Sequence, residues 1–262
     1  MTKEKKELLA KIINPVTGRT VIVPMDHGVT DGPIPGLVRM DEIIKKVKAG
    51  GASAIVIHKG IYKIYKDVIG DLPVFIHISG STGMSATLRK VLVATPREVK
   101  ALGAQGVSIH LNLGNEHEGE MLRDLGMVAR ECEEEGLPLL AMMYPRTMID
   151  GKIVHYRDAA RVKHAARVAA ELGADIVKVP FTGDAESFRE VVEGSPIPVV
   201  IAGGAKGSEE IMLSSIRDCV RVGAAGVSVG RNVFQSDDVV SFMEKIRDAV
   251  FNSSNVVINK KK

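Results

Sequence analysis

A lysine stands in the middle of a short apolar run, Ile176-Val177-Lys178-Val179-Pro180. An isolated ammonium ion is poorly solvated in apolar surroundings, so this side chain must find partners, lose its charge or reach water. An uncharged amine here could form a Schiff base with a carbonyl substrate. The structural alternative is that Lys178 extends along its aliphatic stem to solvent. Lys59 competes for the Schiff-base role, but it lies beside Gly60 at the expected exit of a strand, where water solvates the charged form.

Two further side chains could move protons in a reaction at that amine. Asp26 follows an apolar run at Val21–Met25, and Tyr144 ends another at Pro138–Tyr144. A carboxylate can shuttle protons at a Schiff base, and a phenol can act as acid or base on a carbinolamine or an aldol oxygen. Each residue also has a structural interpretation: Asp26 as a capping or ion-paired carboxylate, and Tyr144 as a rim residue with a hydrated hydroxyl.

Glycines follow the last two apolar runs of the chain. Gly203 and Gly204 come after one run, and Gly230 comes after the other, next to Arg231. Exposed backbone N–H groups of such loops commonly cradle a phosphate, with Arg231 or Lys206 supplying positive charge. The alternative is that the glycines only permit tight turns. Phosphate binding is favoured because both loops are rich in glycine and one carries an arginine.

Four histidines lie near the ends of consecutive apolar runs: His27, His58, His77 and His110. Such a set could hold a metal ion, since zinc needs about three well-placed nitrogen or oxygen donors. However, the sequence contains no HxH or HExxH spacing, and single histidines at strand ends are also typical of hydrogen-bonded core imidazoles. We therefore expect neither a metal nor another cofactor.

Eight apolar, β-branched runs alternate with amphipathic helical segments and would position these side chains. The runs are Val21–Met25, Ala54–His58, Val74–Ser79, Val107–Asn112, Pro138–Tyr144, Ile176–Pro180, Pro198–Ala202 and Gly226–Gly230. Helices are expected at Met40–Ala49, Pro96–Leu102, Glu120–Glu135, Arg157–Leu172, Ala185–Glu193, Glu209–Val222 and Asp237–Val250, with a short one at Ile61–Lys66.

Apolar runs joined by helices indicate a parallel sheet. Eight such units in about 240 residues predict an α/β fold, a single-domain (β/α)8 TIM barrel whose chemistry lies at the carboxyl ends of its strands. A doubly wound open sheet is the alternative, but PMDHG stands where its dinucleotide fingerprint would be. We expect a helical N-terminal extension at 1–19, the barrel at 20–256 and a lysine-rich tail at 257–262.

The composition excludes several classes of protein. With 262 residues and 45% hydrophobic content, the chain can bury a substantial core. A net charge of +3, 4% aromatic residues and no tryptophan do not indicate a nucleic-acid-binding surface. No apolar run reaches membrane-spanning length, and the charged N-terminus is unlike a signal peptide. Cys132 and Cys219 are typical of reduced thiols, so we expect a cytoplasmic protein.

Five motifs occur in the order and spacing of the archaeal-type class I aldolases, the group of fructose-bisphosphate and DeoC-like aldolases. They are PMDHG at 24–28, MYPR at 143–146, DIVK at 175–178, AGG at 202–204 and VGRN at 229–232. The chain resembles this group from about residue 20 to 250. The resemblance implies a Schiff base on Lys178, proton transfer by Asp26 and acid–base catalysis by Tyr144. It implies substrate or phosphate contacts at Asp26, His27, Gly28, Val29, Thr30, Tyr144, Pro145, Arg146, Gly203, Gly204, Gly230 and Arg231.

The details of the motifs distinguish activities within the group. Met142 stands where fructose-bisphosphate aldolases carry tryptophan, and VPMDHGVTDGP and HKGI are similar to the branch that makes 2-amino-3,7-dideoxy-D-threo-hept-6-ulosonate. This branch implies a transaldol reaction of the phosphosugar 6-deoxy-5-ketofructose 1-phosphate with the aldehyde acceptor L-aspartate semialdehyde, in the archaeal route to 3-dehydroquinate. Class I fructose-1,6-bisphosphate aldolase is the alternative, and related thiolases share the lysine.

Two further expectations come from the same resemblance. Thr147 replaces the glycine that usually follows YPR, so the loop that shapes the acceptor pocket should differ. Members of the group form large ring assemblies, which implies a homo-oligomer such as a decamer. The resemblance implies no membrane and no nucleic-acid partner.

Overall fold

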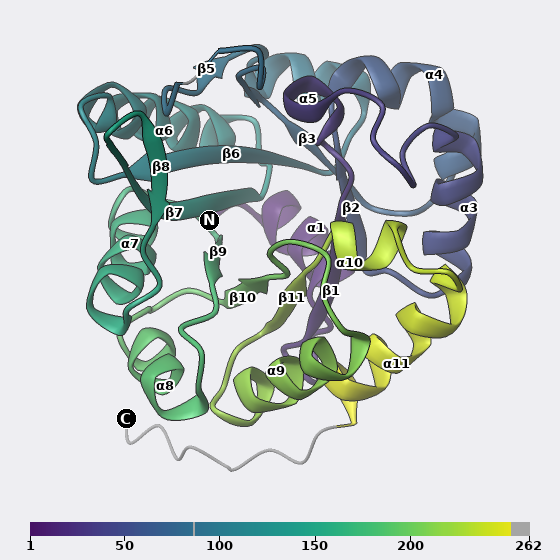
Figure 1. The fold of residues 1–262 in the computed structure, drawn as a ribbon. Helices are drawn as coiled ribbons and strands as arrows, with labels where there is room; N and C mark the ends of the chain where they lie inside the picture. The colour runs from purple at the N-terminus through teal and green to yellow at the C-terminus, as the bar shows by residue number, and fades with distance from the viewer. Residues whose placement is uncertain (86, 253–262) are drawn as a thin grey trace.

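The protein, seen in a computed structural model that describes residues 1–85 and 87–252, is built on a closed barrel of parallel strands (Figure 1). Eight strands in the described residues form it, in the order β6-β3-β2-β1-β11-β10-β9-β7, and β6 pairs with β7 to close the ring. They are β1 (Thr20–Pro24), β2 (Ala54–Ile57), β3 (Val74–His77), β6 (Gly106–Leu113), β7 (Leu139–Ile149), β9 (Ile176–Pro180), β10 (Val199–Ala202) and β11 (Gly226–Ser228). The predicted (β/α)8 barrel and its eight strands are confirmed.

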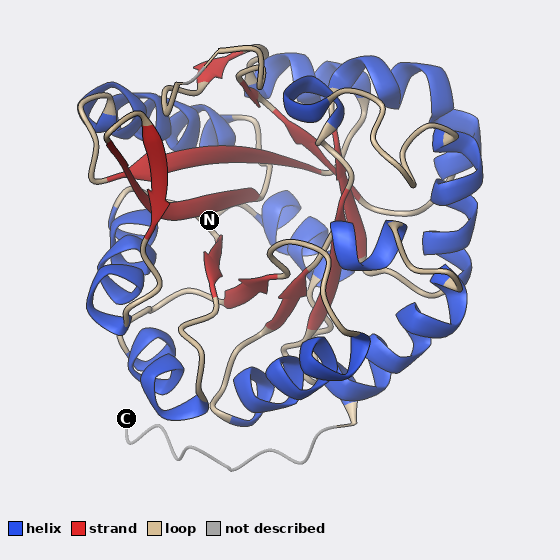
Figure 2. Ribbon diagram, viewed as in Figure 1, coloured by secondary structure: helices blue, strands red, loops and turns tan. Residues whose placement is uncertain are grey.

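Helices surround the barrel on the outside (Figure 2). The main ones are α3 (Met40–Ala49), α4 (Lys59–Ile69), α5 (Pro96–Leu102), α6 (Glu118–Glu134), α7 (Ala159–Glu171), α8 (Ala185–Glu193), α9 (Glu209–Arg221) and α11 (Val239–Phe251). Side-chain caps start several of them: Asp158, Asp184 and Asp238 each accept a hydrogen bond from a backbone N–H in the first turn. The short helix expected at Ile61–Lys66 is part of the longer α4.

The strands bury both faces, which explains why their sequences are continuously apolar. Alternate residues face the barrel interior, where one cluster comprises Ile22, Val56, Phe75, Leu140, Met142, Ile176 and Val200 among others. The intervening residues pack against the helices in a second, larger cluster. The two cysteines are free and buried, Cys132 on α6 and Cys219 on α9.

Helix α1 (Lys3–Ile12) closes the amino end of the barrel and lies behind the strands in Figure 1. Ile12 is 1% exposed and belongs to the interior cluster. Lys5 is 2% exposed, and its Nζ lies 2.9 Å from both Glu133 Oε2 and Asp175 Oδ2. Apolar side chains and these ion pairs occupy this end in the described residues, and the cavity that contains Lys178 lies at the opposite, carboxyl end of the strands. The predicted lysine-rich tail at 257–262 lies outside the described residues.

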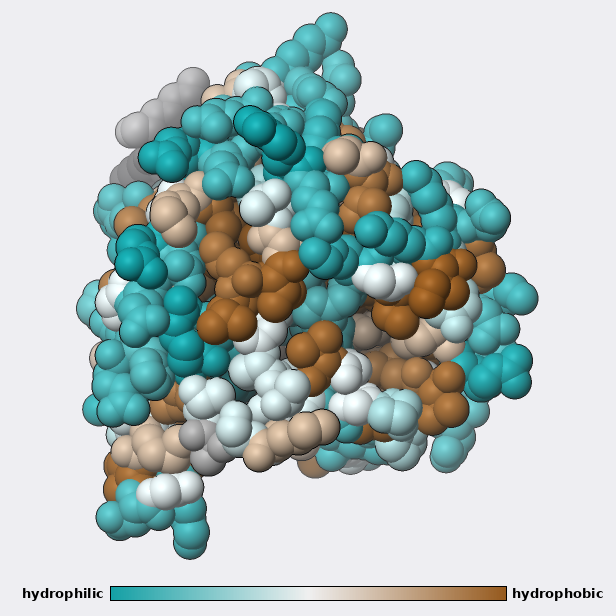
Figure 3. Space-filling view, turned by 90° about the horizontal axis from the view of Figure 1, so that it is seen from above, coloured by the Kyte–Doolittle hydropathy of each residue, from teal (hydrophilic) through white to brown (hydrophobic). Residues whose placement is uncertain are grey.

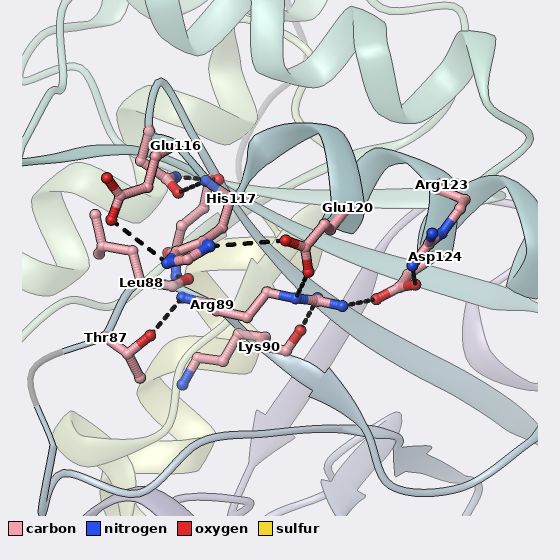
Figure 4. A network of polar contacts seen from close by, with 11 residues as sticks. Thr87, Leu88, Arg89, Lys90, Glu116, His117, Glu120, Arg123 and Asp124 are labelled. Atoms are coloured by element: carbon pink, nitrogen blue, oxygen red, sulfur yellow. Dashed lines mark hydrogen bonds and ion pairs between the residues drawn. The ribbon is translucent and has the colours of Figure 1, made fainter.

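Two hairpins that the sequence did not predict cover part of the carboxyl end. The first pairs β4 (Ser79–Gly80) with β5 (Val91–Leu92), and the second pairs the end of β7 with β8 (Lys152–His155). Arg89, beside β5, binds α6: its Nε donates to Glu120 at 2.7 Å and its Nη2 lies 2.8 Å from Asp124 Oδ2 (Figure 4). The first hairpin is therefore fixed to the barrel wall by a charged network.

The face of the molecule that Figure 3 shows has many hydrophilic side chains. Figure 3, which shows the molecule from above, has apolar side chains in several separate patches among polar ones. In the described part of the chain, no helix combines the length and apolar character needed to cross a membrane.

Candidate active site

Lys178 lies inside the carboxyl end of the barrel and is 6% exposed. On β9 it is level with Met142 of β7 on one side and Val200 of β10 on the other. Its Nζ lies 4.0 Å from the Met142 sulfur. It lines a cavity of about 590 Å³ that Tyr144 also lines. The amine therefore points into the barrel mouth. Lys178 does not extend to solvent, which was the structural alternative.

Asp26 follows β1 and lies among histidines. Its Oδ2 is 3.6 Å from His77 Nε2, and its Oδ1 is 3.9 Å from His27 Nδ1. Burial raises the pKa of Asp26, but the charges of nearby groups lower it by a larger amount. The pKa therefore lies well below its ordinary value; the groups that lower it are His77, His27, Lys178 and His58. Asp26 is thus a carboxylate at neutral pH, and the charge of Lys178 is one of those that lower its pKa.

The histidines form a buried group of neutral imidazoles. His77 Nδ1 lies 2.7 Å from Ser108 Oγ, and its ring meets that of His58 edge-on with centroids 5.2 Å apart. Burial lowers the pKa of His77 to about 4, although Asp26 opposes this shift. Burial also places the pKa of His110 well below its ordinary value, and its Nε2 lies 2.9 Å from Asn112 Oδ1. Within residues 1–85 and 87–252, no three His, Cys, Asp or Glu side chains are grouped as a metal site requires.

The Tyr144 ring contacts an imidazole and a guanidinium group. The His110 ring stacks on it with centroids 4.8 Å apart, and the Arg146 guanidinium carbon lies 4.3 Å from its ring centroid. Arg146 Nη1 donates to Asn112 Oδ1 at 3.3 Å, whereas its buried Nε has no hydrogen-bond partner. Burial lowers the pKa of Arg146, and the charges of Arg231 and Arg157 lower it further. The phenol is therefore held in a fixed orientation at the cavity wall.

The glycine loops after β10 and β11 are packed so closely that larger residues would not fit. A Cβ at Gly203 would lie 2.6 Å from Val229 Cγ1, and one at Gly230 would lie 2.5 Å from the Pro24 carbonyl oxygen. Asn232 secures the first loop: its Nδ2 donates to the carbonyls of Gly203 at 2.9 Å and Ala205 at 3.1 Å. These contacts keep backbone groups at the cavity surface, as a phosphate cradle requires.

A family model described as DeoC/LacD family aldolase matches residues 20–236. The chain belongs to the DeoC/LacD aldolase family. It is 42% identical over 240 residues to 2-amino-3,7-dideoxy-D-threo-hept-6-ulosonate synthase 1 of Archaeoglobus fulgidus, covering 90% of this chain and 86% of that one. It is 31% identical over 242 residues to the class 1 fructose-bisphosphate aldolase of Thermoproteus tenax, covering 89% and 90%.

A solved structure of an archaeal fructose-1,6-bisphosphate aldolase carries the carbinolamine intermediate on its catalytic lysine. Its chain is 29% identical to this one, with a TM-score of 0.86, and the match covers 94% of this chain and 99% of that chain. This DeoC/LacD aldolase is accordingly an enzyme of the class I, Schiff-base type.

Most of the residues predicted for the site line the same cavity as Lys178. They are His27, Tyr144, Pro145, Arg146, Gly203, Gly204, Gly230 and Arg231. Asp26 is not in the lining, but its Oδ1 lies 3.9 Å from Nδ1 of His27, which is. Gly28, Val29 and Thr30 are in helix α2 (Gly28–Asp31), outside the lining, and the Thr30 carbonyl accepts from Gly83 N at 2.8 Å. Thr30 therefore contacts the β4–β5 hairpin, and Val29 lies beside it, because a Cβ built on Gly80 would be 3.6 Å from Val29 Cγ1.

Other expected residues lie away from the cavity. Lys59 is in α4, where its Nζ pairs with Glu98 at 2.9 Å. Lys206 turns away from the glycine loop, and its Nζ donates to the Gln235 carbonyl at 2.6 Å. Thr147 pairs with Val154 in the β7–β8 hairpin and lines hollows on the outer side of it. Of the two cations expected beside the glycine loops, Arg231 therefore lines the cavity and Lys206 does not; Arg231 lies at the start of α10 (Arg231–Phe234).

Sequence reasoning missed several residues of the cavity. His155, Tyr156 and Arg157 reach it because the β7–β8 hairpin folds back over the barrel mouth. The signal was present at the turn: Asp150 and Gly151 have φ values of 49° and 71°, and Asp-Gly is a common type I′ hairpin turn. Ser228 was also missed; its hydroxyl is buried in the cavity wall without a hydrogen-bond partner.

Proposed function

We propose that this aldolase is a 2-amino-3,7-dideoxy-D-threo-hept-6-ulosonate synthase, acting on 6-deoxy-5-ketofructose 1-phosphate and L-aspartate semialdehyde. The observation that carries the proposal is the buried Lys178, which shares one cavity with Tyr144 and with the glycine loops. The identity to the Archaeoglobus synthase is also higher than the identity to the Thermoproteus aldolase, 42% against 31%.

The first half-reaction cleaves the donor. The Lys178 amine adds to the C5 ketone, and loss of water from the carbinolamine, with Tyr144 as acid, gives the Schiff base. A base then removes the proton of the C3 hydroxyl and the C3–C4 bond breaks. Its electron pair moves into the C4–C5 enamine, with the iminium nitrogen as electron sink. Hydroxypyruvaldehyde phosphate leaves, and a hydroxyacetone enamine stays on the enzyme.

The second half-reaction builds the product. C4 of the enamine attacks the aldehyde carbon of L-aspartate semialdehyde, and the new alkoxide takes a proton from Tyr144. Water then hydrolyses the Schiff base and frees the amine. Asp26, held ionised beside His77, can return protons at the lysine in both halves. The phosphate of the donor would lie against Gly203, Gly204, Gly230 and Arg231.

Fructose-1,6-bisphosphate aldolase is the second candidate, because the protein has relatives with that activity. The residue beside the amine differs from the one that the fructose-bisphosphate aldolases typically carry. Met142 is 2% exposed and its sulfur faces Lys178, so an apolar thioether fills the position that a larger tryptophan would occupy. We propose that this difference widens the pocket next to the Schiff base and disfavours the fructose substrate. In keeping with the group, we also propose a cytoplasmic homo-oligomer, whose mass light scattering would measure.

Borohydride trapping combined with product analysis tests the function. Incubation with 6-deoxy-5-ketofructose 1-phosphate and borohydride should add one reduced adduct to the peptide that contains Lys178. Without borohydride, L-aspartate semialdehyde should be consumed only when the donor is also present. The proposal fails if no adduct forms on Lys178, or if fructose 1,6-bisphosphate is cleaved to triose phosphates faster than the ketose donor is used.

A further inference from the structure

Three arginines face the same cavity without acidic partners. Arg146 comes from β7, Arg157 follows β8 and Arg231 follows β11, and all three line the cavity with Lys178. Among the described residues, the lining contains no Asp or Glu, and none of the three arginines forms an ion pair with one. Clustered cations without counter-ions raise the energy of the empty site, so this surface is suited to an anionic ligand.

Arg157 reaches across the cavity towards the glycine loop. The β7–β8 hairpin holds its backbone, with Tyr156 N donating to the Pro145 carbonyl at 3.0 Å. A Cβ built on Gly204 would lie 3.9 Å from Arg157 Nη2. The β7–β8 register also places the neighbouring His155 opposite Arg146, whose buried Nε lacks a partner. Arg157 thus stands between the glycine loop on one side and Arg146 on the other.

The proposed reaction brings two anions to this place in succession. Both aldehydes, the leaving one and the incoming one, react at the same enamine carbon and exchange protons with the same phenol, so both must lie on one side of Lys178. The leaving aldehyde carries a phosphate, whose phosphorus is four bonds from the reacting carbon. The acceptor carries a carboxylate, whose carbon is three bonds away. A single cation that can shift by about one bond length could serve both groups.

We propose that Arg157 binds the phosphate of the donor in the first half-reaction and the carboxylate of the acceptor in the second. This inference rests on the proposed function. Arg157 is exposed and has a long flexible stem, so it can follow the shorter anion inward, towards Arg146. Its guanidinium offers paired N–H donors that match the oxygens of both groups. Once the phosphate has left, Arg157 is free to bind the carboxylate of the acceptor, and this contact makes the enzyme selective for an acidic aldehyde.

Kinetics of the Arg157→Met variant test the double role. The substitution keeps most of the stem and removes the charge, so the KM for the donor and the KM for L-aspartate semialdehyde should both rise about 10- to 100-fold. Arg157→Lys should recover part of each loss. Propanal is an acceptor without a carboxylate, so the KM for propanal should be the same in the variant and the parent. Arg167→Met on the outside of α7, where Arg167 pairs with Glu171, is the matched control and should change neither KM.

Inorganic phosphate provides a second probe of the same site. It should inhibit the parent enzyme competitively against the donor and also against the acceptor, and Arg157→Met should relieve both effects. A rise in only one of the two KM values, or phosphate competition with only one substrate, would overturn the shared role. Borohydride trapping separates the two hypotheses: an adduct on Lys178 with unchanged kinetics in Arg157→Met defeats this inference alone, and the absence of an adduct defeats the proposed function as well.

Discussion

The two halves of the barrel mouth both contain polar residues but differ in how these residues are packed. In the half formed by β7, β9, β10 and β11, cationic side chains and glycine loops surround an open cavity. In the half formed by β1, β2, β3 and β6, imidazoles and Asp26 are packed together beside the β4–β5 hairpin. We call these the open half and the closed half.

The difference shows how one barrel separates binding from proton control. The arginines of the open half have no acidic partner among the described residues, so their charge is available to an anionic substrate. Within the group of Asp26 and the histidines in the closed half, the carboxylate carries the charge at neutral pH, because burial lowers the pKa values of the histidines. The pKa of Asp26 lies well below its ordinary value, so this carboxylate stays ionised at neutral pH. Substitutions in the two halves should consequently produce different kinds of defect.

The largest difference is expected between the two lysines, one from each half. Lys178→Met should lower kcat by at least about 10⁴-fold, because the covalent intermediate can no longer form. Lys59→Met should leave kcat within about twofold, since a half-exposed pair with Glu98 contributes little to stability or catalysis. Steady-state assays of both variants, with circular dichroism to verify folding, make the comparison.

A result in the other direction would be decisive. If Lys59→Met lost activity and adduct formation while Lys178→Met kept them, the amine would belong to the closed half. The assignment of the halves would then be reversed.

The sequence predicted the elements of the barrel well and the residues of its rim less well. Lys178, Tyr144 and the glycines could be placed because strand periodicity and the carboxyl-end rule fix where they face. Arg157 was predicted to lie in a helix, and it reaches the cavity only because β7 continues beyond Tyr144 and turns back at Asp150. Such a position depends on contacts between distant segments, which local patterns do not encode.

The histidines illustrate a second limit of the sequence. Their spacing left a metal site and hydrogen-bonded core imidazoles as alternatives. The structure supplies the partners, Ser108 for His77 and Asn112 for His110. Asn112 is two residues from His110 on the same strand, whereas Ser108 of β6 faces His77 only after β3 and β6 have paired. Whether a polar residue binds a ligand or a neighbour depends on those pairings.

The closed half should also determine how stability depends on pH. The pKa of His77 falls from 6.5 to about 4 in the folded protein, so the unfolded chain binds more protons between these values. Its contribution to stability is fully present above about pH 6.5 and is lost as the pH falls towards 4, an effect on the order of 3 kcal/mol. Chemical denaturation of the parent at pH 7 and pH 4.5 should show this loss.

The His77→Gln variant sharpens the test. Glutamine can still hydrogen-bond but does not titrate, so the decrease in unfolding free energy between the two pH values should become smaller. His164→Gln, on the exposed surface of α7, is the matched control and should decrease like the parent. An equal decrease in all three proteins would show that the closed half does not govern the acid response.

The smallest of the three effects is expected in the open half, at Asn232. Its side chain is 4% exposed and joins three backbone groups: the carbonyls of Gly203 and Ala205, and the N–H of Gly207 at 2.9 Å from Oδ1. Asn232→Ala leaves these groups without partners, at a cost of about 1–3 kcal/mol. Because the loop then moves, the KM for the donor should rise about 10-fold, whereas the pH dependence of stability should not change.

Asn252→Ala, which removes an exposed bond to Asp248, controls for the loss of an amide at the surface. If Asn232→Ala altered the acid response as strongly as His77→Gln does, the two halves would be one coupled network. If it altered only the donor KM, loop geometry and proton control would be independent. The second outcome is expected, because the contacts of Asn232 are confined to the β10 loop and do not reach the Asp26 group.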